Sequence, residues 1–231
     1  CRDYAGHWVG VQREQLKRLG IWGDWENPYL TMDFSSEAVI ASELMKFAES
    51  GQLYRGAKPV MWSPVEQTAL AEAEVEYEDI TSTQVDVAFE IVDAPPSTLV
   101  GQMVGRGEPI FAVIWTTTPW TIPVNRAIAY GPGIEYVMGY QQGGPNLLMA
   151  KELVDASRAR GMLLDAPFHI LWEGRGADLD GAIARHPWHE QGGFFAEPRP
   201  LLAGDFVTTD AGTGLVHMAP DHGEDDFYLC K

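Results

Sequence analysis

The sequence contains little cysteine and no long hydrophobic run. Only two of its 231 residues are cysteine, Cys1 and Cys230, and they stand at opposite ends. So few cysteines exclude a disulfide-based scaffold and are consistent with a reducing cytoplasm. No window approaches the roughly 20 apolar residues that a membrane-spanning helix needs, and no basic start followed by an apolar stretch marks a signal peptide. We therefore expect a cytoplasmic chain without a membrane partner, and the missing N-terminal Met suggests a piece of a longer protein.

Basic residues are also scarce. The chain has 16 Lys and Arg against 33 Asp and Glu, which gives a net charge of −17. Affinity for a nucleic-acid backbone comes mainly from Lys and Arg contacts that release counterions, so this balance excludes a long phosphate-binding surface. Any nucleic-acid role must use a small local site or depend on other parts of a larger protein. The 45% hydrophobic content is sufficient for a sizeable core.

Residues 1–62 are predicted to be mainly helical. Apolar residues at helical spacing indicate one helix over 9–19 and another over 37–49, with Ser35 or Ser36 as the cap of the second. From Pro59 onward the period changes from 3.6 to 2. Glu alternates with other residues over 71–78, and because a helix would stack these like charges at i and i+4, the pattern favours a strand.

Residues 63–231 carry many short strand-like segments separated by turns rich in Gly and Pro, and one helix over 151–160. This pattern favours a barrel or sandwich with a few helices over a parallel βαβ array. The composition changes near residues 55–65, which is the expected domain boundary. The predicted strands are 85–91, 110–115, 126–130, 135–140, 147–149, 168–172 and 214–218.

Two segments could carry chemistry. The first, residues 115–126, reads WTTTPWTIPVNR, and its two prolines prevent regular strand pairing. Its hydroxyls and free backbone N–H groups could bind a carbonyl, an oxyanion or a ribose. Threonine is also a common strand residue, and prolines mark edges and turns, so the residues alone favour a structural role.

The second segment, residues 210–227, reads DAGTGLVHMAPDHGEDDF. His217 alternates with apolar neighbours and is predicted to face a cavity, while Asp226 is predicted to lie in the first turn of a helix after Gly223. Such a pair suits the binding of a cationic amine and the orientation of water. Acidic residues also favour helix starts for dipole reasons, so the residues alone leave both interpretations open.

Other kinds of site are not supported. His186 and His189 lack a cysteine nearby and the spacing of a zinc site, so we expect satisfied or surface histidines. Residues 174–176, Gly-Arg-Gly, lack the third glycine of a dinucleotide-binding motif. No nucleophile elbow of the form G-x-S-x-G is present, and neither cysteine has a histidine nearby, which disfavours covalent catalysis.

Taken together, the segments resemble the connective insertion of isoleucyl-tRNA synthetases. WTTTPWTIPVNRAI at 115–128 is similar to that family's threonine-rich editing peptide, and DAGTGLVHMAPDHGEDDF at 210–227 is similar to its second editing motif. ALAEAEVEY at 69–77, GDW at 23–25 and PYLTMDF at 28–34 also match, in the family's order. Valine and leucine enzymes carry TTRP where Thr116 to Pro119 stand here, so the isoleucine type fits best.

The resemblance implies an α+β fold, an editing β-barrel over 63–231 after a helical stem over 1–62. It implies hydrolysis of the ester that joins valine to the isoleucine tRNA, with the 3′ end of that tRNA and the rest of the parent synthetase as partners. Asp226 would bind the α-ammonium group, and His217 would line the amino-acid pocket. Thr116, Thr117, Thr118 and Trp120 would hold the terminal adenosine and the ester. The substrate-binding residues implied are Trp120, Thr121, Asn125 and His222.

The chain departs from the family at residues 62–66, Trp-Ser-Pro-Val-Glu, where many members have cysteines of a zinc site. We therefore expect no metal and no cofactor in this chain, although the parent synthetase would use ATP and Mg. The signatures for amino-acid activation are missing, so ligase activity is not expected from this chain alone. The family's insertion also continues past the second motif, so part of the barrel's outer structure is expected to be missing. Two alternatives are a non-catalytic module that positions the tRNA end and a free-standing deacylase of related fold.

Overall fold

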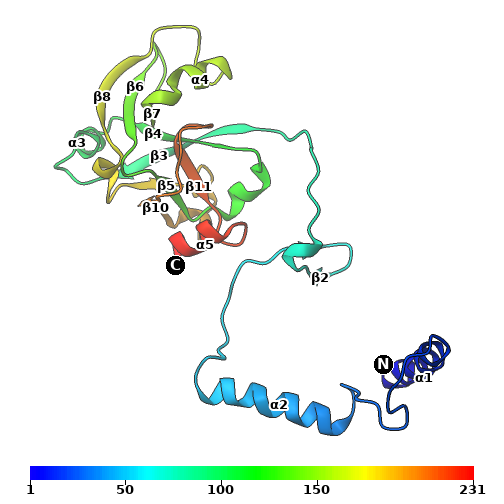
Figure 1. The fold of residues 1–231 in the computed structure, drawn as a ribbon. Coiled ribbons are helices and arrows are strands. Elements are labelled where there is room, and N and C mark those ends of the chain that lie inside the picture. Colours follow the sequence, from blue (N-terminus) through cyan, green and yellow to red (C-terminus); the bar gives the residue numbers. More distant parts are fainter. The chain divides into compact units, whose positions relative to one another are not determined.

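The first part of the chain is built on two helices, α1 (Arg2–Arg18) and α2 (Phe34–Glu49). The computed structural model describes residues 1–231, which form two units, Cys1–Ala57 and Lys58–Lys231 (Figure 1). Both predicted helices are confirmed, and each begins before the predicted start. The predicted serine cap of α2 is wrong: the N-cap is Asp33, whose carbonyl accepts the amide of Glu37 at 2.9 Å, so both serines lie inside the first turn.

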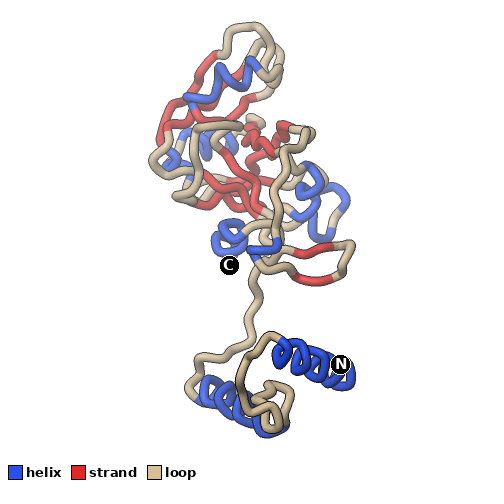
Figure 2. Tube along the Cα trace, turned by 45° about the vertical axis from the view of Figure 1, so that its right-hand side comes forward, coloured by secondary structure: helices blue, strands red, loops and turns tan.

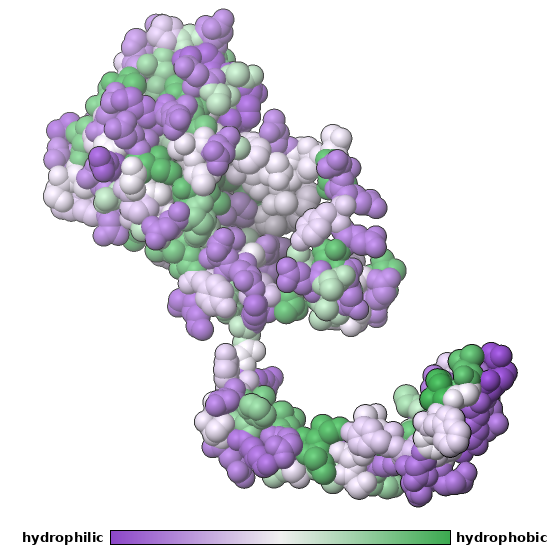
Figure 3. Space-filling model, in the orientation of Figure 1, coloured by the Kyte–Doolittle hydropathy of each residue, from purple (hydrophilic) through white to green (hydrophobic).

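The apolar residues of α2 are exposed within this unit. Neither helix has a buried residue, and six apolar side chains of α2 each expose more than half of their surface: Phe34, Val39, Ile40, Leu44, Met45 and Phe47. Apolar atoms are correspondingly visible along α2 in Figure 3. No helix of the chain combines the length and the apolar character needed to cross a membrane.

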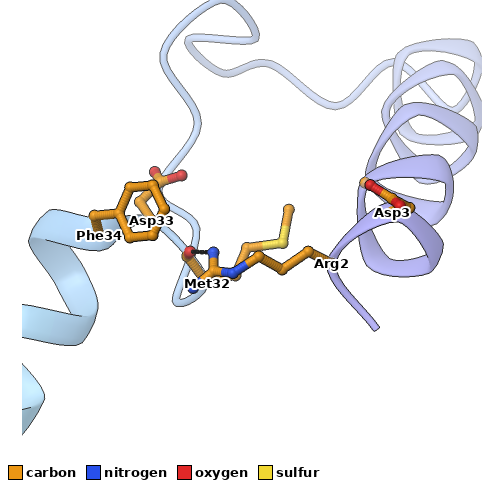
Figure 4. Close-up of a pocket in the computed structure, with 6 residues that line it drawn as sticks. Arg2, Asp3, Met32, Asp33 and Phe34 are labelled. Atoms are coloured by element: carbon orange, nitrogen blue, oxygen red, sulfur yellow. Dashed lines mark hydrogen bonds between the residues drawn. The ribbon is translucent and has the colours of Figure 1, made fainter.

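Arg2 links the two helices of the first unit. Its guanidinium donates to the carbonyl of Met32 and to the carboxylate of Glu37, and its Cζ lies 4.7 Å from the ring centroid of Phe34. A shallow pocket lies around these groups, with Asp3 on its wall (Figure 4). The pocket faces solvent, and its lining carries one basic and two acidic side chains, because Asp33 also lines it.

The second unit contains a mixed nine-stranded sheet of order β11-β5-β10-β9-β3-β4-β7-β6-β8. Its strands are drawn in red in Figure 2. The pairs β10–β5 and β4–β7 are parallel, and the other pairs are antiparallel. The seven strands predicted between residues 85 and 218 are confirmed, whereas β9 and β10 were not predicted. The strands are β3 (Val85–Asp93), β4 (Ile110–Thr116), β5 (Ala127–Tyr130), β6 (Glu135–Tyr140), β7 (Asn146–Ala150), β8 (His169–Arg175), β9 (Ile183–Arg185), β10 (Pro198–Ala203) and β11 (Leu215–Met218).

Three helices pack around this sheet. α3 (Leu99–Gly105) contributes Val100 and Met103 to the main core, where they join fully buried strand residues such as Phe89 and Ile128. The predicted helix over 151–160 is confirmed as a 3₁₀ turn, η3 (Lys151–Leu153), followed by α4 (Val154–Ala159). α5 (Glu224–Cys230) packs its last residues against β5 and β11.

The expected α+β class is confirmed, and the barrel takes the form of a curled sheet without a closed hydrogen-bonded ring. The strand order starts at β11 and ends at β8, and these two strands do not pair. Instead, the turn before β11 reaches back across the sheet: the amide of Ala150 donates to Thr213 at 2.8 Å, and the Tyr136 hydroxyl donates to Gly214. The core is therefore enclosed by side-chain and turn contacts, where a ring of strands was expected.

The predicted strand over 71–78 is wrong. Residues Glu72–Glu74 form a 3₁₀ turn, η1, and residues 75–84 belong to no helix or strand. On the expected apolar face, Ala71, Ala73 and Tyr77 are exposed and only Val75 is partly buried. Alternation makes a strand only when a neighbouring strand accepts its hydrogen bonds, and the short preceding hairpin of β1 (Trp62–Ser63) and β2 (Thr68–Ala69) pairs only with itself.

Candidate active site

The two motif segments meet because β11 pairs with β5. In this antiparallel pair His217 lies opposite Ile128, and the amide of Arg126 donates to the carbonyl of Met218 at 2.9 Å. The threonine-rich segment runs directly into β5. The pairing therefore brings His217 beside residues that precede it by about ninety positions in the sequence, as the 96-residue separation of Thr121 and His217 indicates.

The threonine-rich segment folds as a loop and a 3₁₀ helix, η2 (Pro119–Val124). Pro119 suits the first helical position because its fixed φ is already helical and its missing N–H would have had no partner. The Oγ1 atom of Thr116 accepts the amide of Thr118 at 3.0 Å and lies 3.1 Å from the hydroxyl of Thr118. The Thr121 hydroxyl donates to the carbonyl of Thr118 at 2.8 Å. These bonds hold three hydroxyl groups in a row.

His217 is bonded through both ring nitrogens. Its Nε2 lies 2.8 Å from Oγ1 of Thr121, and its Nδ1 lies 3.5 Å from Nδ2 of Asn125. Because the Thr121 hydroxyl gives its proton to a carbonyl, it accepts from Nε2–H, and Nδ1 accepts from the Asn125 amide. The contacts therefore select the neutral tautomer that carries its proton on Nε2.

The electrostatic surroundings also favour neutral His217. Burial lowers the pKa of His217 below its ordinary value of 6.5, and nearby His222 and His186 lower this pKa further, while Asp226 opposes them. The imidazole is thus uncharged at neutral pH, and both nitrogens are occupied by protein groups. It is suited to shaping a pocket wall and less suited to accepting a proton from water.

Asn125 closes the other side of the His217 ring. It is fully buried, and its Nδ2 also donates to the carbonyl of Ala127 at 2.8 Å. Its Oδ1 has no hydrogen-bond partner. A buried acceptor without a partner costs about 1–3 kcal/mol, so the site tolerates an unfavourable group directly beside His217.

Asp226 lies in the first turn of α5, as predicted. Its Oδ1 accepts a hydrogen bond from the amide of Ala219 at 2.6 Å. Because Ala219 is two residues beyond His217, this bond holds the carboxylate close to the end of β11. Gly223 allows this fold-back, because a Cβ at that position would lie 2.5 Å from Oδ2 of Asp226. The bond to Ala219 uses one carboxylate oxygen and leaves the other without a protein donor.

The remaining predicted residues lie outside this network. Thr117 is exposed, and only its carbonyl is used, as the acceptor of the Ser82 hydroxyl at 2.7 Å. Trp120 is 64% exposed and makes no hydrogen bond. His222 is exposed, and its backbone amide donates to Ala219 at 2.8 Å. The structure thus joins Thr116, Thr118, Thr121, Asn125 and His217 in one hydrogen-bonded group, with Asp226 beside it.

Sequence reasoning did not identify the support behind this group. His186, predicted to be satisfied or on the surface, is fully buried and donates from Nε2 to the carbonyl of Ile122 at 3.0 Å. No signal in the sequence pointed to this role, because the strand before His186, residues 183–185, is too short to show a periodic pattern. No group of three or more His, Cys, Asp or Glu side chains is arranged to hold a metal ion.

Comparisons with known proteins agree with the motifs. Residues 1–211 match the family described as tRNA synthetases class I (I, L, M and V). The isoleucine–tRNA ligase of Zymomonas mobilis subsp. mobilis is 61% identical over 232 residues, which cover 100% of this chain and 24% of that protein. That of Gluconobacter oxydans is 52% identical over 240 residues, again 100% of this chain and 24% of that protein. The chain thus spans about a quarter of the length of these relatives.

A comparison with solved structures supports the fold. The crystal structure of GlLeuRS-CP1 superposes with a TM-score of 0.51 over 63% of this chain and 58% of that chain, at 16% sequence identity. At this identity the likeness concerns the fold alone. It covers less of the chain than the sequence relatives do.

Proposed function

We propose a function from the premise that this chain belongs to the class I tRNA synthetases of the isoleucine, leucine, methionine and valine group. The chain carries the editing part of an isoleucyl-tRNA synthetase and hydrolyses the ester of valine wrongly attached to the isoleucine tRNA. The observation that carries this proposal is the contact of Thr121 Oγ1 with His217 Nε2 at 2.8 Å, which unites the two motifs that resemble editing peptides.

Such an activity is needed because valine differs from isoleucine by a single methylene group. A hydrophobic pocket that binds isoleucine gains only about 1–3 kcal/mol from that group, or about 10–200-fold discrimination against valine. A second site that admits valine and excludes isoleucine multiplies this ratio. In the proposal, neutral His217 is a wall of that second site, and the bonds to Thr121 and Asn125 keep its ring from turning aside to admit the larger side chain.

The substrate amine is assigned to Asp226. The α-ammonium group of the valyl moiety requires a carboxylate with a free oxygen, and Oδ2 of Asp226 meets that requirement, because only Oδ1 is bonded to Ala219. Such a charge-assisted hydrogen bond orients the ester as well as binding it. The acidic composition of the chain is compatible with a cationic group on the substrate.

The ester and the terminal adenosine are assigned to the threonine-rich segment. The hydroxyl of Thr118, in the middle of the row, accepts from Thr116 in this arrangement and donates its own proton to the carbonyl oxygen as negative charge develops there. Exposed Trp120 offers a ring face to the adenine, and Thr117 and His222 border the opening. Water forms the new C–O bond, the bond to the ribose oxygen breaks, and the proton of water passes to that oxygen directly or through a second water.

The larger enzyme supplies the remaining contacts in this proposal. The proposal also includes a division into a stem over 1–62 and an editing domain over 63–231. It further includes a cytoplasmic location and a chain that binds no cofactor. The rest of the parent synthetase would cover the exposed apolar residues of α2 and hold most of the tRNA, since a chain of charge −17 is poorly suited to that task.

The test is a comparison of valyl- and isoleucyl-tRNA, both made with the isoleucine tRNA. We expect the chain to release valine and to leave isoleucine attached. Asp226→Ala should lower valine release by about 30-fold or more, because the loss of one partner of a desolvated charge pair costs at least about 2 kcal/mol. Asp225→Ala is the matched control, since Asp225 is an exposed carboxylate in the same turn.

Each other outcome has a separate meaning. Release of both amino acids would contradict the assigned specificity, and equal effects of the two substitutions would contradict the role of Asp226. Release by the full-length relative but not by this chain would mean that the catalytic groups need the rest of the enzyme. If neither releases valine, the hydrolytic proposal is wrong and a module that only positions the tRNA end becomes the better explanation.

A further inference from the structure

A fully buried histidine lies behind the site, on an element that neither motif contains. His186 follows β9, and its ring is enclosed by three aromatic side chains. The ring centroid of Phe195 lies 4.9 Å away, that of Trp188 5.5 Å and that of Phe89 5.8 Å. A polar ring in such surroundings is costly unless both of its nitrogens are paired.

Both nitrogens of His186 have backbone partners. The amide of Trp188 donates to Nδ1 at 3.0 Å, so Nε2 carries the proton and donates to the carbonyl of Ile122 at 3.0 Å. Burial lowers the pKa of His186, the bond to the Ile122 carbonyl opposes this shift, and neighbouring Arg199 and His189 lower the pKa further. The ring is therefore neutral, as this pattern of one acceptor and one donor requires.

The carbonyl of Ile122 occupies a particular place in the site. It also accepts the amide of Asn125, at 3.0 Å, and so closes the end of η2. Ile122 lies between Thr121 and Asn125, the two residues whose side chains meet Nε2 and Nδ1 of His217. A shift of this carbonyl would move both partners of His217 together.

The helix η2 is weakly stabilised by its own hydrogen bonds. Pro119 and Pro123 supply no backbone N–H, and a 3₁₀ helix has weaker hydrogen-bond geometry than an α-helix. Its position therefore depends on contacts from outside. The bond from His186 is one that reaches η2 from the segment after β9, across 64 residues of sequence.

We propose that His186 is a positioning residue for the editing reaction: its bond to the Ile122 carbonyl holds η2 so that Thr121 and Asn125 fix the orientation and tautomer of His217. The catalytic consequence rests on the function proposed above, whereas the structural linkage from His186 to His217 does not. His186 touches no substrate in this proposal and acts only through these two residues.

The test uses two substitutions of His186, one that keeps the bond to the Ile122 carbonyl and one that keeps the bond to the Trp188 amide. The amide nitrogen of Gln is as many bonds from Cβ as Nε2, so His186→Gln keeps a donor for Ile122. The oxygen of Asn corresponds to Nδ1, so His186→Asn keeps an acceptor for Trp188 and loses the donor. Phe89→Leu is the control for packing, because Phe89 borders the His186 ring without a bond to η2. If the Asn variant does not fold, His186→Met replaces it.

Two readouts are measured on the whole chain. In nitrogen NMR of the imidazoles, His186→Asn should shift the His217 Nε2 resonance and speed exchange of its proton, while His186→Gln and Phe89→Leu leave both unchanged. In deacylation of valyl-tRNA, the Asn variant should lose about 10- to 100-fold in kcat, since small misplacements cost rates of that order, and KM should change by less than about threefold. The Gln variant should retain kcat within about threefold.

The two readouts keep the linkage and the function apart. An unchanged His217 signal in the Asn or Met variant would overturn the inference even if valine is released. Equal loss in the Asn, Gln and Phe89→Leu variants would also overturn it, because the effect would then come from packing alone. If neither the unsubstituted chain nor the full-length relative releases valine, the proposed function fails, and the His217 signals still decide whether His186 positions His217.

Discussion

At the scale of single residues, Asp226 depends on a neighbour that has no side chain. The carboxylate folds back over Gly223 to reach the amide of Ala219. The φ of Gly223 is −170°, which any residue can adopt, so the requirement for glycine is one of space alone. A Cβ at position 223 would meet Oδ2 of Asp226, the end of a flexible side chain. The carboxylate can move away at little cost to the fold, but it would then leave its present position.

Gly223→Ala should therefore separate activity from stability. We expect valyl-tRNA deacylation to fall by about tenfold, because a displaced carboxylate no longer meets the α-ammonium group. The free energy of unfolding should stay within about 1 kcal/mol of the unsubstituted chain, since Ala also restricts the unfolded state. Gly105→Ala in α3, where a Cβ would meet nothing within 4 Å, is the control. Urea unfolding and initial rates test this, and an unchanged rate would refute the spatial argument.

The lowered pKa of His217 predicts that the stability of the folded chain depends on pH. Well above pH 6.5, the ordinary histidine pKa, the ring is neutral in both states and pH has no effect through it. As pH falls below that value, the unfolded chain binds a proton that the folded chain resists, so stability declines until pH passes the lower folded-state pKa. Lowering pH from about 7.5 to about 5 should thus destabilise the chain through His217.

Urea titrations at both pH values measure this contribution when His217→Gln is run beside the unsubstituted chain. The carboxylates contribute to both proteins alike, so the difference isolates the imidazole. We expect the variant to lose less stability on acidification. Identical losses would mean that His217 titrates in the folded chain as it does in the unfolded chain.

At the scale of elements, alternation in the sequence was informative only where a partner strand exists. The strands β3, β4 and β6 follow it closely, but residues 71–78 have the same pattern and form no strand. β10 was hidden because Pro198 and Pro200 disfavour a strand. β9 has three residues, too few for a periodic signal.

The site was predictable in its parts and not in its connections. The two motifs could be found by resemblance, and the helix that carries Asp226 by its glycine and acidic start. The bonds of His217 to Thr121 and of His186 to Ile122 join residues 96 and 64 positions apart, through strand pairings that local patterns do not encode. Sequence reasoning thus identified the chemical groups and missed what orients them.

Hydrogen exchange tests the correction to residues 71–84. The backbone amides from Glu76 to Gln84 donate to no protein group, and most of these residues are exposed. They should exchange close to the rate of an unstructured peptide, whereas the amides of β3 that pair with β4 should be protected. Protection of residues 76–84 comparable to that of β3 would restore the strand that the alternation predicted.

At the scale of the whole molecule, charge and exposed surface lead to the same expectation. A chain with a net charge of −17 has little to offer a tRNA backbone, and α2 exposes an apolar face that no part of its own unit covers. The relatives are about four times as long, since the match covers 24% of each. Both features are compatible with the setting of the proposed function, in which the chain is part of a larger enzyme.

The pairing of β11 with β5 also orders events in time. A ribosome adds about 5–20 residues each second, so the 96 positions from Thr121 to His217 take about 5 to 20 s to make. Throughout that interval the nascent chain already contains the threonine row and lacks the histidine that completes it. If the proposed function is right, the nascent chain cannot hydrolyse a mischarged tRNA until β11 has been synthesised. The proofreading activity then appears only near the end of the synthesis of these 231 residues.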